Sequence, residues 1–214
     1  MAEFVRARTS EQKAQRLEQI KEVAKAQFSC RPYHEITLTT IADELGWSRA
    51  NLYKYITTKE EIFLLIMGDM LAAYMDALLA AFPQGCGFDA QTIAQVWGGI
   101  ASAHKDMFRY GNLLIQVIET NVTVEKLADF KGGYYQELAL MEEQLPNVLG
   151  VRKALLPQLV NDVYYHGIGL AGSCHNNPLV KEALKSIGIK PATIDFKGQM
   201  TRFVGMCLDW YQKQ

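Results

Sequence analysis

Apolar residues recur at three- and four-residue steps along most of the chain, a pattern typical of amphipathic helices. The first such segment predicts a helix from about residue 10 to residue 29, with Ile20, Ala24 and Phe28 on one face. Charged residues occupy the opposite face. Pro32 prevents easy continuation of this helix, because proline lacks a backbone N–H and restricts the residue before it.

Two short helices and one long helix are expected next. Thr37 is a suitable N-cap for a helix over 38–45, and Gly46 is suited to end it in a left-handed conformation. Ser48 is the expected N-cap of a third helix over 49–55. The pattern over 59–81 predicts a long fourth helix that ends before Pro83. Its stretch 62–67 is apolar nearly all round, so it should be covered on more than one side.

The rest of the chain also has helical periodicity, interrupted by polar residues, glycine and proline. No segment alternates in the manner of a strand, and no internal repeat is present. The predicted fold class is therefore all-α, with an N-terminal domain over 1–58 and a helical domain over 59–214. The further helices are expected at about 89–109, 112–120, 123–145, 151–170, 178–186 and 196–212.

The composition is that of an ordinary globular protein, with 214 residues, 49% hydrophobic and 21% charged. The longest purely apolar run, 62–67, is far shorter than a membrane span. The first ten residues contain Glu3, Arg6 and Arg8 and lack the apolar core of a signal peptide. We therefore expect a cytoplasmic protein that has no membrane partner.

The sequence gives little indication of catalytic or cofactor chemistry. Cys174 and His175 are adjacent, but the cysteines and histidines lack the spacing of a metal site, so no metal is expected. Residues 167–172 read G-x-G-x-x-G, yet they follow a helical pattern, not a strand, which argues against a dinucleotide site. No nucleophile elbow, phosphate-binding loop or paired-carboxylate site is recognisable. We expect neither a cofactor nor an enzyme activity.

Residues 38–55 have the spacing of a helix-turn-helix. Ala42 is small where two helices cross, Gly46 lies at the turn, and Trp47 closes it with an apolar contact. The outer face of the third helix presents side chains suited to base edges and phosphates. Charge is a weak pointer to DNA, because the net charge is −1 and residues 1–60 carry ten Lys and Arg against eight Asp and Glu. A generic helical hairpin remains an alternative on spacing alone.

Residues 17–66 resemble the N-terminal domain of the TetR family of bacterial transcriptional repressors. The most specific matches are the segments 52–56, Leu-Tyr-Lys-Tyr-Ile, and 59–62, Lys-Glu-Glu-Ile. Further matches are Ile20, Ala24, Phe28, Thr37, Ile41, Ala42, Gly46, Trp47 and Ser48. This chain departs from the family at 31–33, Arg-Pro-Tyr, where glycine and an aromatic residue are usual, and at Ile56, where phenylalanine is usual.

The resemblance implies roles for residues of the helix-turn-helix. Arg49, Ala50 and Asn51 would face the major groove, and Thr37 and Thr39 would lie near a phosphate. Tyr53, Tyr55 and Lys59 would contact phosphates. The DNA-binding residues implied in this way are Thr37, Thr39, Ser48, Arg49, Ala50, Asn51, Tyr53, Lys54, Tyr55 and Lys59.

The resemblance also implies dimerisation and effector binding in the C-terminal region. Apolar stripes on the expected helices over 151–170 and 196–212 are the predicted homodimer interface, formed by Leu159, Val163, Gly167, Leu170, Met200, Phe203, Val204, Cys207, Leu208 and Tyr211. Aromatic residues with polar tips suit an apolar small molecule. The candidates for the effector pocket are Trp97, His104, Met107, Phe108, Tyr110, Tyr134, Tyr135, Tyr164 and His166. For any single one of them, a role in the core is the alternative.

The sequence therefore predicts a homodimeric regulator that binds near-palindromic double-stranded operator DNA and is released by a small molecule. The alternative is a helical small-molecule binding protein or enzyme in which the N-terminal hairpin is purely structural.

Overall fold

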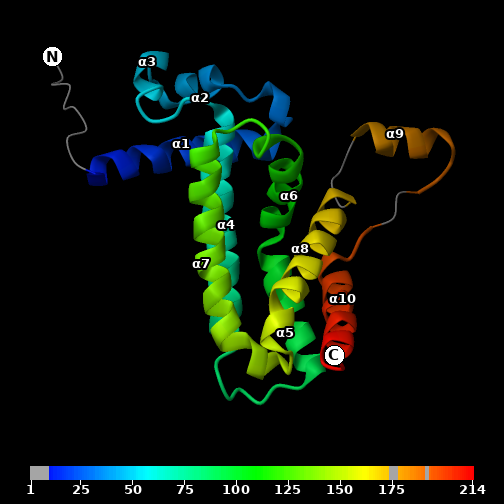
Figure 1. Ribbon diagram of the computed structural model, residues 1–214. Coiled ribbons are helices and arrows are strands. Elements are labelled where there is room, and N and C mark those ends of the chain that lie inside the picture. The colour runs from blue at the N-terminus through cyan, green and yellow to red at the C-terminus, as the bar shows by residue number, and fades with distance from the viewer. Residues whose placement is uncertain (1–9, 174–177, 191–192) are drawn as a thin grey trace. The chain divides into compact units, whose positions relative to one another are not determined.

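The computed structural model describes residues 10–173, 178–190 and 193–214, and these ranges contain helices but no strand (Figure 1). The all-α fold class is confirmed. The α-helices are α1 (Ser10–Cys30), α2 (Leu38–Leu45), α3 (Arg49–Leu52), α4 (Lys59–Ala81), α5 (Ala90–Ala103), α6 (Lys105–Leu113), α7 (Val124–Leu149), α8 (Leu156–Ser173), α9 (Pro178–Ser186) and α10 (Phe196–Tyr211). Short 3-10 helices span Tyr33–Glu35 and Lys153–Leu155, and a π-helix spans Leu114–Ile118.

The chain forms two compact units. Unit 1 comprises Met1–Asp69 and Leu114–Phe130, and unit 2 comprises Met70–Leu113 and Lys131–Gln214. The limits between them fall inside α4, between α6 and the π-helix that follows it, and inside α7. The segment 114–130 was not expected to belong with the N-terminal helices, because nothing in its sequence identifies its packing partner. The functional boundary after residue 58 stays a prediction.

Unit 1 is built on an aromatic and aliphatic core. Phe28 of α1 contacts Phe63 of α4 edge-to-face, with ring centroids 5.4 Å apart, and Tyr33 contacts the same ring at 5.0 Å. Ile41 and Leu52 bring α2 and α3 into this core and are fully buried. The expected close covering of residues 62–67 is confirmed, since all of them except Leu65 are buried.

A buried glutamine links α1 to α2. The Gln27 side-chain amide donates to the Thr40 carbonyl at 2.9 Å and to the Glu44 carboxylate at 2.7 Å. It also accepts from the Thr40 hydroxyl at 2.8 Å. Because its amide is satisfied in this way, Gln27 can be almost fully buried without an unmet polar group.

A buried lysine links α1 to α4. The Lys21 ammonium pairs with Asp69 at 2.5 Å and with Glu18. Burial opposes the charge of Lys21, but the two carboxylates outweigh burial and raise its pKa.

Helix α4 is long and apolar enough to cross a membrane by length and composition alone. Half of its most apolar window is buried inside the protein. Composition is therefore weak evidence for a membrane span here.

Close backbone contacts hold the helices of unit 2 together. A Cβ added to Gly98 of α5 would lie 2.9 Å from the Thr201 backbone of α10, so α5 and α10 touch where only glycine fits. A Cβ added to Gly167 of α8 would lie 2.3 Å from the Phe108 ring of α6. The interior of unit 2 continues as an aromatic chain in which Trp97 donates to the Tyr74 hydroxyl at 2.7 Å.

Several predicted helix limits were wrong. α3 ends at Leu52 and continues only as turns to residue 55. The expected helix over 89–109 is interrupted at His104, whose backbone (φ −101°, ψ 28°) leaves the helical region. α7 continues through Pro146 to Leu149, because Pro146 lies in the last turn and is buried there, which offsets the lost N–H bond.

The predicted dimer stripes were assigned to the wrong faces of α8 and α10. Eight of the ten residues are already buried within a single subunit, so they form its core: Leu159, Val163, Gly167, Met200, Val204, Cys207, Leu208 and Tyr211. The Tyr211 hydroxyl, for example, donates to Asp162 of α8 at 2.5 Å. An apolar stripe shows that a face is covered, but not whether the same chain or a partner covers it. Only Leu170 and Phe203 are partly exposed.

Adjacent glycines in α5 allow a matched test of this packing. We predict that Gly98→Ala lowers the free energy of unfolding by about 2 kcal/mol or more, because the methyl group overlaps the Thr201 backbone. Gly99→Ala has open space around the new Cβ and should raise stability by up to about 1 kcal/mol through helix propensity. Urea denaturation of both variants measures the difference, and equal stabilities would contradict the close contact of α5 with α10.

Candidate nucleic-acid interface

Helix α2 begins at a reciprocal cap. The Thr37 hydroxyl accepts from the Thr40 N–H at 3.1 Å, and the Thr40 hydroxyl accepts from the Thr37 N–H at 3.1 Å. The N-cap role of Thr37 is confirmed. Both hydroxyls serve the helix end, and the Thr37 side chain remains exposed.

The turn between α2 and α3 depends on a left-handed glycine. Gly46 has φ 66° and ψ 29°, as its sequence position predicted. The Trp47 N–H donates to the Ala42 carbonyl at 2.9 Å and the Gly46 N–H to the Asp43 carbonyl at 3.1 Å, which together form a Schellman motif. Ser48 follows at once and caps α3 by accepting from the Asn51 N–H at 3.2 Å. Two residues therefore separate the end of α2 from the cap of α3.

The outer face of α3 and the turns after it is exposed and polar. Arg49, Ala50 and Lys54 are exposed, and the Tyr53 side chain is 53% exposed. Asn51 is half-buried, and its side-chain oxygen accepts from the Lys54 ammonium at 3.5 Å. On the other face, Leu52 anchors the helix in the core. Chemically, this surface carries the donors and acceptors that base edges and phosphates require.

The remaining predicted contact residues lie beside this surface in less exposed positions. Thr39 is half-buried in the first turn of α2. Tyr55 packs against Trp47, with ring centroids 5.8 Å apart, so part of its ring supports the turn. The structure thus brings the predicted residues onto a single motif of unit 1.

Lys59 has a structural role that the sequence did not reveal. Its ammonium donates to the carbonyls of Tyr33 and Ile36, at 2.9 Å each, and lies 4.0 Å from the centre of the Tyr33 ring. Burial lowers the pKa of Lys59, and the neighbouring carboxylate of Glu60 offsets part of this effect. Two of the three ammonium donors are used inside the subunit, so a phosphate contact by Lys59 stays a prediction.

Tyr33 explains how the unusual sequence at 31–33 is accommodated. Its ring packs edge-to-face against both Phe28 and Phe63, and its hydroxyl donates to the Glu60 carboxylate at 2.8 Å. The aromatic residue that the family usually places here is therefore present one residue after Pro32. This departure therefore changes packing within unit 1.

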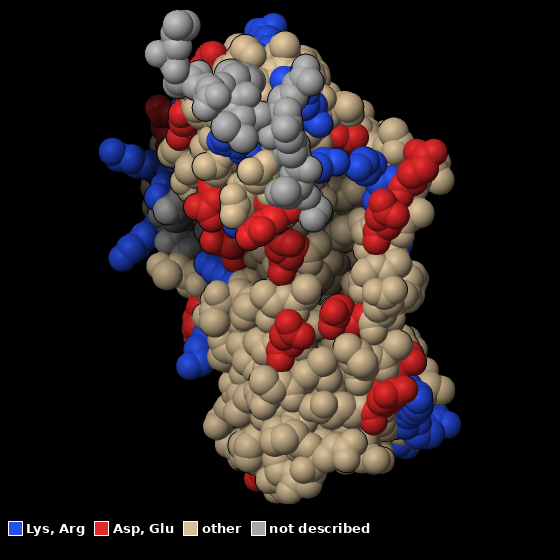
Figure 2. Space-filling model, turned by 90° about the vertical axis from the view of Figure 1, so that its left-hand side faces the viewer, with Lys and Arg blue, Asp and Glu red and all other residues tan. Residues whose placement is uncertain are grey.

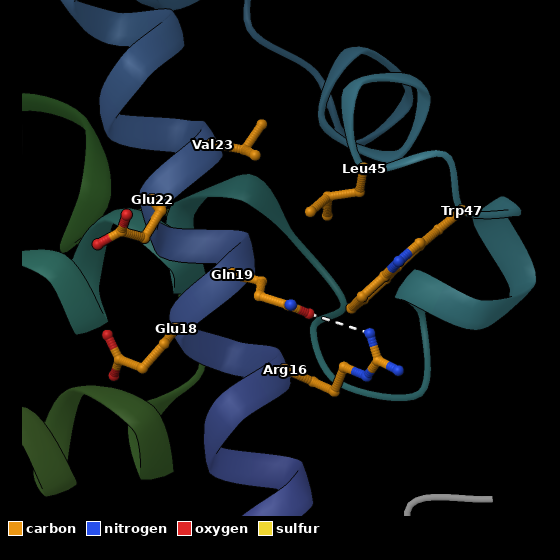
Figure 3. Close-up of a pocket in the computed structure, with 7 residues that line it drawn as sticks. All are labelled: Arg16, Glu18, Gln19, Glu22, Val23, Leu45 and Trp47. Carbon is orange, nitrogen blue, oxygen red and sulfur yellow. Dashed lines mark hydrogen bonds between the residues drawn. The ribbon is translucent and has the colours of Figure 1, made fainter. Parts of the chain in front are cut away.

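An open hollow of about 680 Å³ lies between α1 and the turn of the helix-turn-helix (Figure 3). The Arg16 guanidinium lies 5.1 Å from the centre of the Trp47 ring and donates to Gln19 at 3.0 Å. Leu45 and Val23 add apolar walls, while Glu18 and Glu22 line the α1 side. These carboxylates make the hollow unsuitable for a phosphate backbone.

The effector candidates fall into several environments in unit 2. Trp97, Met107, Phe108 and Tyr110 are buried, and the ring of Tyr74, which sequence reasoning missed, contacts both Phe108 and His104. Phe108 also faces the Tyr164 ring, at 6.2 Å between centroids. This group is a packed aromatic cluster. In the sequence, this cluster is indicated only by the number of aromatic residues in this part of the chain.

Three other effector candidates lie elsewhere. Tyr135 is 63% exposed, so the prediction that it lines an interior pocket was wrong. The Tyr134 hydroxyl donates to Asn161 of α8 at 3.1 Å. His166 stacks on Phe203 of α10, with ring centroids 3.7 Å apart, and burial lowers its pKa. Within the described ranges no group of three metal-binding side chains occurs, and Cys174 and His175 lie outside those ranges.

Two family models match the chain over nearly its whole length. Residues 20–66 match the bacterial regulatory proteins of the tetR family, and residues 69–212 match the tetracyclin repressor-like C-terminal domain. The chain belongs to the TetR family. As a member of this family, it is a ligand-responsive DNA-binding transcriptional regulator. The resemblance found in residues 17–66 is therefore confirmed and extends to the C-terminal region.

Solved structures share this TetR fold at low sequence identity. A TetR/AcrR regulator from Thermobifida fusca YX-ER1 is 16% identical, with a TM-score of 0.53, over 91% of this chain and 96% of that one. The fatty acid degradation regulator FadR from Bacillus halodurans is 13% identical, with a TM-score of 0.56, over 90% and 93%. SCO7222, a TetR from Streptomyces coelicolor, is 14% identical, with a TM-score of 0.50, over 92% and 97%. No curated protein matches in sequence.

The contrast between Lys59 and Lys54 gives a testable prediction. Lys59→Ala should lower the free energy of unfolding by about 1–3 kcal/mol, because two partly buried carbonyls lose a charged donor. Lys54→Ala should change it by less than about 0.5 kcal/mol, since Lys54 is exposed. Thermal or urea unfolding measures both changes. Equal effects would show that the Lys59 contacts add nothing to stability.

Proposed function

We propose that this TetR regulator is a cytoplasmic, non-enzymatic repressor. It binds a near-palindromic operator as a homodimer and leaves the DNA when a small molecule binds unit 2. The single observation that best supports DNA reading is the exposed face of Arg49, Ala50 and Lys54, formed by α3 and the turn that follows it. Ser48 caps α3, Leu52 anchors it in the core, and only Gly46 and Trp47 separate this cap from the end of α2.

The proposed contacts follow from side-chain chemistry. Arg49, in the first turn of α3, pairs with guanine, Asn51 pairs with adenine, and the Ala50 methyl group contacts thymine. Tyr53, Lys54 and the hydroxyls of Thr37, Thr39 and Ser48 contact the phosphates around these bases. Tyr55 packs behind this surface and contacts a phosphate with its hydroxyl. Lys59 contacts a phosphate with the ammonium N–H that the carbonyls of Tyr33 and Ile36 leave unused.

The proposed effector site is the aromatic cluster of unit 2. Trp97, Phe108 and Tyr74 bury apolar surface and offer few polar groups, which suits a mostly apolar ligand. Entry of a ligand would change the contacts of side chains in or near this cluster, namely Met107, His104, Tyr110 and Tyr164. Coupling to DNA requires only that the effector bind the DNA-free geometry more tightly than the DNA-bound one.

The proposed dimer interface uses the outer faces of α8 and α10. Tyr165 of α8 is 59% exposed, and Met206 and Trp210 of α10 are 63% and 52% exposed. Gly169 lies one turn after Tyr165, and nothing in the subunit lies within 4 Å of the place where its Cβ would be, so a partner helix can approach closely there. Leu170 and Phe203 flank this surface. The same helices that were predicted from the sequence are used, but on the opposite face.

Selection of DNA by the purified protein tests the proposed function. We expect a random duplex library, bound at moderate salt, to yield a near-palindromic sequence with two half-sites. The rival function, a helical small-molecule binding protein or enzyme, predicts no enrichment of any sequence. The selected duplex then serves as the operator in mobility-shift assays.

Arg49→Ala should weaken binding to this operator by about 1–3 kcal/mol and relax the preference at one base pair in each half-site. Lys54→Ala is the matched control. Loss of a phosphate contact should weaken binding to all sequences alike and lower the slope of log affinity against log salt concentration by about 1 per contact. Binding of operator variants over a salt series separates the two cases. A uniform loss for Arg49→Ala would show that Arg49 contacts a phosphate instead.

Met206→Asp should raise the dimer dissociation constant by at least about 30-fold. In a two-fold interface the charge is buried twice, and each unpaired charge costs free energy. Val124→Asp changes a side chain that is 82% exposed and lies outside α8 and α10, so it serves as the control. Sedimentation velocity over a concentration series measures both. An unchanged dimer for Met206→Asp would place the interface on another surface.

A further inference from the structure

Three side chains from separate parts of unit 1 form a series of contacts beside the helix-turn-helix. The Arg16 guanidinium of α1 lies 5.1 Å from the centre of the Trp47 ring, and the Trp47 and Tyr55 rings are 5.8 Å apart between centroids. Trp47 belongs to the turn between α2 and α3, and Tyr55 lies in the turns after α3. This contact series therefore connects α1 to one of the proposed phosphate contacts.

The backbones of Trp47 and Tyr55 are fixed locally, but their rings are not held by burial. The Trp47 N–H donates to the Ala42 carbonyl at 2.9 Å, and the Tyr55 N–H donates to the Leu52 carbonyl at 3.0 Å. Both side chains are only half-buried, and the Trp47 ring borders the open hollow beside α1 (Figure 3). The direction of the Trp47 ring therefore depends on the contact with Arg16.

Arg16 is directed at Trp47 and not at a carboxylate. Figure 3 shows Arg16 and Gln19 on the side of α1 that faces the Trp47 ring. The side chains of Glu18 and Glu22 point away from that ring. The guanidinium donates to Gln19 at 3.0 Å and forms no ion pair with a described residue. A planar guanidinium is well suited to lie on an aromatic ring in this way.

The Tyr55 hydroxyl is available for a partner outside the subunit. The hydroxyls of Tyr33 and Tyr211 donate to carboxylates of their own chain, whereas the Tyr55 hydroxyl forms no hydrogen bond with a described residue. A phosphate oxygen can accept from this hydroxyl. Ordering a side chain when DNA binds costs free energy, so a ring that already has the required direction binds more tightly.

The charge of this part of the chain gives no uniform attraction for DNA. Residues 1–60 carry ten Lys and Arg against eight Asp and Glu. In the space-filling view, acidic side chains lie among the basic ones on the surface around α1 and the helix-turn-helix (Figure 2). Affinity for DNA must therefore come from individual contacts that are held in the right direction, which favours a positioning role for Arg16.

We propose that Arg16 is a positioning residue for operator binding, which acts through Trp47 to hold the Tyr55 hydroxyl toward a DNA phosphate. The inference rests on the proposed function, because it concerns the phosphate contact of Tyr55. Arg16 does not touch the DNA itself. Its guanidinium holds the indole ring, and the indole ring sets the direction of the Tyr55 ring. Without Arg16 the indole can turn toward the hollow, and the Tyr55 ring must then be ordered when DNA binds.

Operator binding by Arg16→Gln, alone and combined with other variants, tests this role in the full-length protein. Glutamine removes the charge at this exposed position and is also a good helix former, so the variant should fold. Loss of an exposed cation–π contact corresponds to about a two- to fivefold change in an equilibrium constant. Because both subunits of a dimer are changed, we expect operator affinity to fall about four- to 25-fold.

A second substitution shows whether Arg16 acts along the contact series. Tyr55→Phe removes the hydroxyl and keeps the ring, and in this background Arg16→Gln should have no further effect, because the group that it positions is gone. In a Trp47→Leu background the effect should vanish as well, since the intermediate ring is missing. Tyr53→Phe is the matched control. It removes a proposed phosphate contact outside the series and should leave the effect of Arg16→Gln at its full size.

Three results would overturn the proposal. The first is an unchanged operator affinity for Arg16→Gln, and the second is the same loss in the wild-type, Tyr55→Phe and Trp47→Leu backgrounds. The third is a fall of about 1 per contact in the slope of log affinity against log salt concentration, which would show that Arg16 contacts a phosphate directly. We expect this slope to stay unchanged. Lys13→Gln removes another exposed cation of α1 and should change affinity by the same factor with and without Tyr55→Phe.

The outcome is separable from that of the proposed function. If the operator selection succeeds and Arg16→Gln has the same effect in every background, the proposed regulator stands and only the positioning role of Arg16 is wrong. If no sequence is enriched, the proposed function fails, and the role of Arg16 in operator binding fails with it.

Discussion

The proposed DNA-reading surface depends on a single backbone constraint, the left-handed conformation of Gly46. Only because this residue reverses the chain can Trp47 close α2 and Ser48 begin α3 with nothing between them. A residue with a Cβ would meet no neighbouring atom here, but it would strain the left-handed backbone conformation that joins α2 to α3. The caps at Thr37 and Ser48 and the anchors Ile41 and Leu52 then hold both helices at the angle that the turn sets.

Polar contacts around the helix-turn-helix also hold its helices in position. Gln27 joins α1 to α2 from a buried position, and the Lys59 ammonium holds the carbonyls of residues 33 and 36. Such groups tolerate no replacement by apolar residues without leaving buried donors or acceptors unmet. Rigidity of this kind matters for a regulator, since a shift of the reading surface by a small distance is enough to misalign base contacts.

Local chemistry made the N-terminal motif predictable from the sequence. The caps Thr37 and Ser48 and the turn at Gly46 are each determined by a few neighbouring residues. The dimer face was not predictable in this way, because Met200 and Leu208 form an apolar stripe whose covering partner is decided by the whole fold. Gly167 was assigned to the dimer interface, but its glycine is required inside the subunit, where the Phe108 ring lies in the place of a Cβ. The continuation of α7 through Pro146 likewise depends on burial that local rules do not contain.

The central claim is that two copies of this helix-turn-helix read successive major grooves of one operator. Hydroxyl-radical footprinting of the wild-type protein on its selected duplex tests the claim most directly. Two protected patches should appear, centred about 10 base pairs apart and related by a two-fold axis, as expected for a helix-turn-helix dimer. A single protected patch, or uniform protection that is the same on unrelated DNA, would contradict the account.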